Sequence, residues 1–93
     1  MGVFIMMGRY SPEAIQGISS RRTQKARNLV EKEGGKIREI YALLGEKDLL
    51  IIAEFPGIEE AVKASVSLTK STGISFTTLP AIPVERFDEI IEG

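Results

Sequence analysis

The chain has 93 residues, of which 43% are hydrophobic and 27% are charged, and its formal net charge is −1. This length and composition fit a single folded domain spanning residues 1–93 and are too apolar for intrinsic disorder. The absence of cysteine and histidine excludes disulfides and thiolate nucleophiles and removes the commonest general base and metal ligand, so we expect no metal site and no cofactor.

The first part of the chain predicts a strand followed by helix. Residues 3–9 are mostly apolar and form the first expected strand. A helix start follows at residues 11–13, where a serine cap precedes a proline and an acid. Gly17 and the two serines at 19–20 interrupt the helical pattern, which resumes until the stop signal at Gly34 and Gly35.

The second part predicts a hairpin, a helix, a strand and a short terminal helix. Strands are expected at 36–44 and 49–55, joined by a tight turn at 45–48. Apolar residues then recur at helical spacing from Ile58 to the stop at Gly73. A fourth strand is expected at 74–79, ended by prolines, before a terminal helix at about 84–92.

This order of elements is that of an α+β ferredoxin-like βαββαβ sandwich, with a four-stranded antiparallel sheet whose first and third strands are central. Residues 3–7 and 49–53 are apolar at consecutive positions, which is typical of strands buried on both faces. Because the helices of one small domain cover a single face, we expect the other face to pack against a second copy, in a homodimer or a higher oligomer.

The hairpin predicts which side chains share a face. If its loop has an even number of residues, Leu44 faces Leu49. The wholly apolar face, expected under the helices, then comprises Ile40, Ala42, Leu44, Leu49, Ile51, Ala53 and Phe55. The other face mixes apolar and polar side chains, namely Glu39, Tyr41, Leu43, Leu50, Ile52 and Glu54.

The same register places Glu39 opposite Glu54, where like charges destabilise a ladder unless they are solvated, protonated or neutralised. Such a pair could share a proton or hold a hard cation. The alternative, which we favour, is that the carboxylates lie in water or beside Arg9 or Arg38.

Tyr41 is the other polar group expected on this mixed face. Its phenol could orient a ligand carbonyl or donate a proton, although an interface anchor is the more common role. Tyr10, which follows Arg9 at the end of the first strand, carries the same two possibilities. Ligand-binding candidates are therefore Tyr41, Glu54, Glu39, Arg9 and Tyr10.

One basic cluster, at Arg21, Arg22, Lys25 and Arg27, is expected to be a solvated helix face, because it lacks interleaved aromatic residues and acids follow it. Nucleic acid and membranes are accordingly not expected partners. The apolar stretches are shorter than a membrane span and the first residues lack a signal-peptide pattern, so the cytoplasm is the expected location.

Several segments resemble the GYD domain family of prokaryotes. The similar segments are residues 4–13, 34–36, 45–48 and 77–81, together with Phe87. The chain departs from the family at Lys47, where the hairpin usually has tyrosine before the aspartate. The resemblance implies a dimeric α/β barrel, in which two sheets pack face to face around a potential cavity, and it implies no assigned activity.

Three functions are compatible with these features. The first is a small dimeric protein that binds a small, partly apolar ligand between its sheets. The second is a cofactor-independent enzyme, similar to a monooxygenase or an isomerase, acting on small carbonyl or aromatic substrates, with Tyr41, Glu54 and Arg9 as its acid–base and anion-holding groups. The third is a purely structural interaction module, whose dimer interior would be packed solid.

Overall fold

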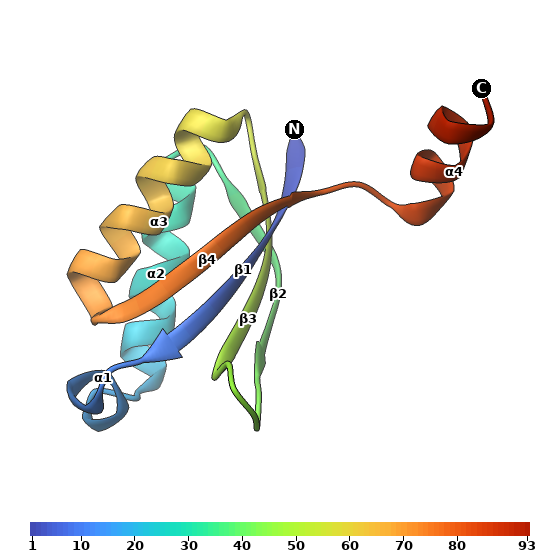
Figure 1. Cartoon of the computed structure of the whole chain (residues 1–93). Helices are drawn as coiled ribbons and strands as arrows, with labels where there is room; N and C mark the ends of the chain where they lie inside the picture. Colours follow the sequence, from blue (N-terminus) through green and yellow to red (C-terminus); the bar gives the residue numbers. More distant parts are fainter.

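Four antiparallel strands form one sheet in the computed structural model, which describes residues 1–93 (Figure 1). The strands pair in the order β2-β3-β1-β4, so that β1 and β3 are central and β2 and β4 are the edges. The order and pairing confirm the ferredoxin-like βαββαβ arrangement and the central position of the two apolar strands. The elements are β1 (Gly2–Tyr10), α1 (Pro12–Gln16), α2 (Ser20–Lys32), β2 (Lys36–Ala42), β3 (Leu49–Phe55), α3 (Ile58–Thr72), β4 (Ile74–Ala81) and α4 (Val84–Glu92).

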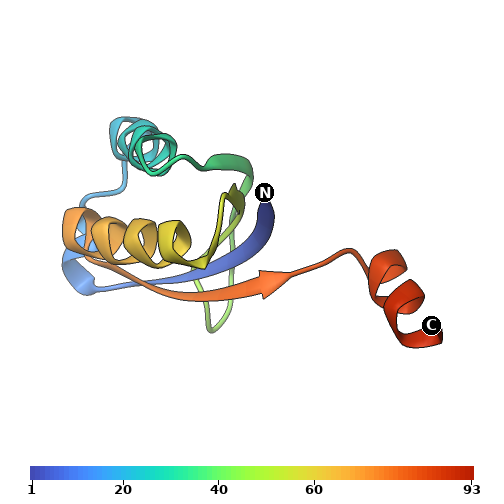
Figure 2. The same cartoon turned by 90° about the horizontal axis from the view of Figure 1, so that it is seen from above.

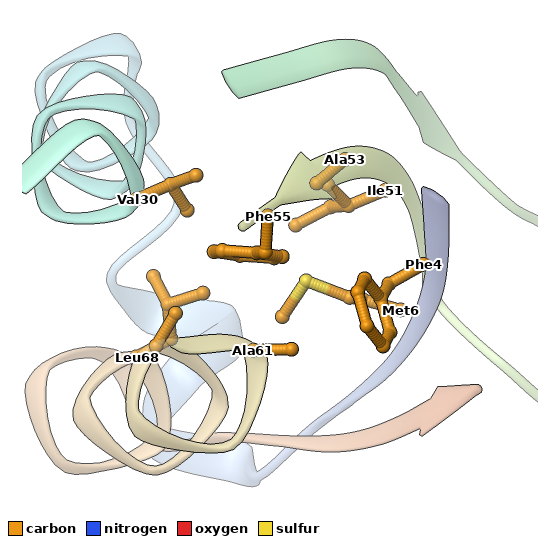
Figure 3. Packing of buried hydrophobic residues seen from close by; sticks show 9 residues of the cluster. Phe4, Met6, Val30, Ile51, Ala53, Phe55, Ala61 and Leu68 are labelled. Atoms are coloured by element: carbon orange, nitrogen blue, oxygen red, sulfur yellow. The ribbon is translucent and has the colours of Figure 1, made fainter. Parts of the chain in front are cut away.

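Helices α2 and α3 cover one face of the sheet and leave the other face open (Figure 2). The side chains under the helices are buried at alternate positions of β1 and β3, as the two-residue period of a strand requires. Phe4 and Phe55 meet edge to face there, with ring centroids 5.8 Å apart. Val30 from α2 and Leu68 from α3 close the same core (Figure 3).

The helix ends follow the predicted signals. Ser11 caps α1 by accepting a hydrogen bond from the Ala14 amide at 3.0 Å, and Ser19 caps α2 in the same way. The predicted interruption between these helices is confirmed. Gly73 ends α3 with a φ of 76°, a left-handed conformation that glycine adopts without a steric penalty.

The hairpin register differs from the predicted one. Ala42 pairs with Leu49, so the connection covers residues 43–48 and Leu44 is a fully exposed loop residue. The prediction that Leu44 lies on the strand under the helices is therefore wrong. The loop still has an even number of residues, and this preserves the predicted division of the remaining strand residues between the two faces.

The last strand is longer than predicted. It continues through Pro80 to Ala81, so proline does not end it at residue 79. Proline is tolerated because β4 is an edge strand, whose outward amides need no partner strand. Beyond it, α4 projects away from the sheet and packs against no other element (Figures 1 and 2). None of the helices combines the length and the apolar character needed to cross a bilayer.

Candidate functional site on the open sheet face

The strand registers arrange the open face in rows that run across the sheet from β2 to β4. One row is Tyr41, Leu50, Met7 and Thr77; the next is Glu39, Ile52, Ile5 and Leu79; a third is Lys36, Glu54, Val3 and Ala81. Apolar side chains thus occupy the centre, and charged and hydroxyl groups gather on the β2 side. We call this surface the open face. It confirms the mixed character predicted for the second face of the hairpin.

The predicted pairing of Glu39 with Glu54 is wrong. Glu39 pairs with Ile52 because the hairpin connection of residues 43–48 sets Ala42 opposite Leu49. A β-bulge at Arg38 then shifts the register between Ile37 and Glu39, so that Glu54 pairs with Lys36. The bulge also directs Arg38 toward Glu54, and its Nε donates a hydrogen bond to Glu54 Oε2 within an ion pair. Glu54 is therefore neutralised by Arg38, which is one of the alternatives drawn from the sequence.

Tyr41 and Glu39 form the second polar contact of the open face. Because they are two residues apart on β2, their side chains project on the same side, and the Tyr41 hydroxyl donates to Glu39 Oε2 at 3.2 Å. Arg9 lies on the same face at the far end of β1, paired with Ser75 of β4. Four of the five candidate residues consequently share this face, with the apolar centre between Arg9 and the β2 groups.

Tyr10, the fifth candidate, lies on the other side of the sheet. The Arg22 guanidinium lies 5.4 Å from the centre of its ring, and its amide donates to Asp48 Oδ2 at 2.9 Å. It lines a cavity of about 50 Å³ between the helices and the sheet, which has room for roughly three or four waters and not for a larger ligand. Tyr10 therefore lies outside the open face, and its contacts are those of a residue that stabilises the fold.

Two of these contacts were not predicted from the sequence. The sequence predicts Arg22 on a solvated helix face, but its guanidinium donates to the Ala14 carbonyl and lies over the Tyr10 ring. The sequence predicts only a turn at Asp48, but this residue also connects the hairpin to the end of β1. Its backbone amide donates to the Gly8 carbonyl, and its carboxylate accepts from the Tyr10 amide. An aspartate that closes a turn before a strand is the signal for such a role.

The hydrogen bond from Tyr41 determines what its phenol can do. The negative charge of Glu39, followed by the hydrogen bond to Glu39 and a smaller desolvation effect, raises the pKa of Tyr41 above its ordinary value. The hydroxyl therefore remains protonated at neutral pH and acts as a hydrogen-bond donor rather than as a base. Nowhere does the structure bring three metal-ligating side chains together.

We expect Glu39→Gln to lower the pKa of Tyr41 toward its ordinary value, because the substitution removes the carboxylate charge. Tyrosinate absorbance during alkaline titration measures this, and Tyr10→Phe isolates Tyr41 because the chain has two tyrosines and no tryptophan. Since the folded-state pKa is raised, the interaction stabilises the fold below the ordinary pKa and is lost as pH rises through the folded value. An unchanged titration in Glu39→Gln would contradict the contact.

Comparison with known proteins supports one assignment. A search of curated proteins finds no significant match. The model of the GYD domain matches residues 4–91, which include the whole sheet apart from the first residues of β1 and nearly all of α4. The chain therefore belongs to the GYD domain family.

Proposed function

We propose that the chain functions as a homodimer whose open faces pack together and hold a small, partly apolar ligand between them. The observation that carries this proposal is the composition of the open face, where an apolar centre lies beside an ordered group of polar side chains.

The apolar centre supports association with a second copy. Val3, Ile5, Met7, Leu50 and Ile52 are only partly buried in the single chain, although they occupy the two central strands. Complete burial of an aliphatic side chain of this size contributes about 1.5–3 kcal/mol relative to full exposure. Packing the apolar rows of two identical sheets against each other would therefore stabilise a dimer with a self-complementary interface.

The polar group supports a ligand at the edge of this interface. A ligand carbonyl or carboxylate oxygen would replace Glu39 as the acceptor of the single Tyr41 O–H, which now donates at 3.2 Å. Arg38 and Arg9 offer guanidinium donors to the same kind of oxygen. No cavity or groove of the single chain lies on the open face, because each is lined by residues on the helix-covered side of the sheet or on the helices themselves. A second copy would therefore be needed to enclose the site, and the apolar rows would contact the apolar part of the ligand.

Native mass spectrometry of protein purified without added ligand tests the proposal. We expect a dimer that carries additional mass, and Tyr41→Phe should keep the dimer while lowering the fraction that carries the ligand, because one hydrogen-bond donor is lost. Thr77→Val, at the other end of the same row, is the matched control and should retain normal occupancy. A dimer without any added mass would leave the interaction module as the better description, and a monomer would overturn the proposal.

A further inference from the structure

Helix α4 is an amphipathic helix without a partner in its own chain. Phe87, Ile90 and Ile91 lie on one side of the helix, and each is at least half exposed. A helix of nine residues is marginal in water without tertiary contacts, because too few hydrogen bonds follow the costly first turn. The projecting segment also expands the molecule, whose radius of gyration is 14.0 Å against about 12 Å for a compact domain of this length.

The connection to β4 directs α4 away from its own domain. Ile82 precedes Pro83 and is therefore restricted to extended conformations, and Pro83 itself is extended, with a ψ of 144°. Only these two residues separate β4 from α4. Such a short, extended connection does not allow α4 to turn back along α3, which lies on the opposite side of the strand end in both views (Figures 1 and 2).

The outer side of α3 offers a matching apolar surface. Ile58, Val62 and Val66 follow one another at four-residue spacing and are each at least half exposed. They border a groove of about 200 Å³ between α3 and β4, which we call the α3–β4 groove; its lining includes Ala61, Ser65, Phe76, Thr78 and Pro80. The apolar stripe formed by Ile58, Val62 and Val66 is about 12 Å long. This length is close to the distance of roughly 10 Å along α4 from Val84 to Ile91.

The charges of α4 are complementary to one end of the α3 surface. Helix α4 carries four carboxylates and one arginine, and that arginine is already paired with Glu89 at 3.1 Å. Glu59 lies beside the first residue of the stripe, whereas its far end, near Val66, is basic. Two lysines lie there: Lys63, which is loosely paired with Glu33 at 3.8 Å, and Lys70, which has no ion-pair partner. Acidic side chains of α4 that dock beside Val66 would therefore face lysines.

We propose that α4 of one copy docks in the α3–β4 groove of a second copy. The inference rests on the proposed dimer: once the sheets hold two copies together, docking becomes intramolecular and a small contact suffices. In each copy the groove lies along β4, the edge strand from which the segment bearing α4 leaves the sheet.

The test uses cross-linking, since the native chain has no cysteine. A Ser67→Cys chain and an Asp88→Cys chain are mixed, allowed to exchange subunits and treated with a short bismaleimide. We expect a covalent heterodimer between α3 and α4. The matched control replaces Ser67→Cys by Asn28→Cys on the exposed side of α2 and should give at least about tenfold less product, as should adding Phe87→Asp to the Asp88→Cys chain.

Equal yields for Ser67→Cys and Asn28→Cys, or no loss with Phe87→Asp, would overturn the proposed docking. A chain carrying both Ser67→Cys and Asp88→Cys provides a further check, because cross-linking within monomers alone would show that α4 docks on its own domain. Sedimentation of the same samples separates the two proposals. A dimer without the α3–α4 product would contradict the docking alone, whereas a monomer would contradict the dimer as well.

Discussion

Phe55→Ala is expected to lower the free energy of unfolding by about 3–5 kcal/mol, the range typical for truncating a buried aromatic side chain. Phe55 has no exposed surface and packs edge to face on Phe4 within the core between the sheet and the helices. Its removal loses both the transfer free energy of the ring and the contacts around the cavity that remains. A domain of this length has a total stability of roughly 5–14 kcal/mol, so the loss would be a large fraction of it.

Urea unfolding at one fixed protein concentration measures this change, because association would make the apparent stability depend on concentration. Phe55→Leu serves as the control and should cost less, since it leaves a smaller cavity. A loss below about 1 kcal/mol in Phe55→Ala would be typical of a surface position and would contradict the packing around Phe55.

A substitution at Gly35 tests the packing around the Phe55 ring independently. A Cβ atom on Gly35 would lie 2.6 Å from the Phe55 ring and 2.9 Å from the Glu54 carbonyl oxygen, closer than non-bonded atoms approach. Gly35→Ala should therefore be destabilising. Gly45→Ala is the matched control, because a Cβ atom there would have no neighbour within 4 Å.

Ile5→Asp is expected to separate the proposed dimer while leaving the chain folded. Ile5 lies in the middle row of the open face, between Ile52 and Leu79, so a symmetric interface would bury one unpaired charge from each copy. The desolvation penalty for a buried unpaired charge is several kcal/mol, which corresponds to a dissociation constant raised by about a thousandfold or more. In the monomer this carboxylate would remain hydrated, so circular dichroism should show the native fold.

Sedimentation velocity across a concentration series measures the effect of Ile5→Asp. Ile18→Asp is the matched control, because Ile18 is an exposed isoleucine between α1 and α2, outside the open face and the α3–β4 groove. It should leave the association unchanged. Equal dimer content in Ile5→Asp and the wild type would show that the open face is not the interface.

Most of the fold is predictable from the sequence because its signals are local. Serine caps, glycine stops and the apolar runs of β1 and β3 each specify an element within a few residues. The order of those elements then leaves few topologies, of which the ferredoxin-like one places the apolar strands in the centre. The division of side chains between the two faces also follows, because it depends only on whether the hairpin loop is even or odd.

The details of the candidate site depend on longer-range effects that sequence patterns do not contain. The six-residue loop moves Glu39 away from Glu54, the bulge at Arg38 places Lys36 opposite Glu54, and neither feature has a distinctive local signal in a polar edge strand. The placement of Tyr10 under the helices with Arg22 depends on how α2 packs on the sheet. For α4 the local pattern predicts a helix, but whether its apolar side is covered within the chain is a tertiary property.

The measurement that tests dimerisation through the open face most directly is sedimentation equilibrium of the unmodified chain at micromolar concentrations. We predict a mass near twice the 10.2 kDa of one chain, with the Ile5→Asp variant closer to a single chain. A wild-type mass equal to one chain across the whole concentration range would contradict the proposed dimer, and with it the ligand site between the sheets and the docking of α4 on a second copy.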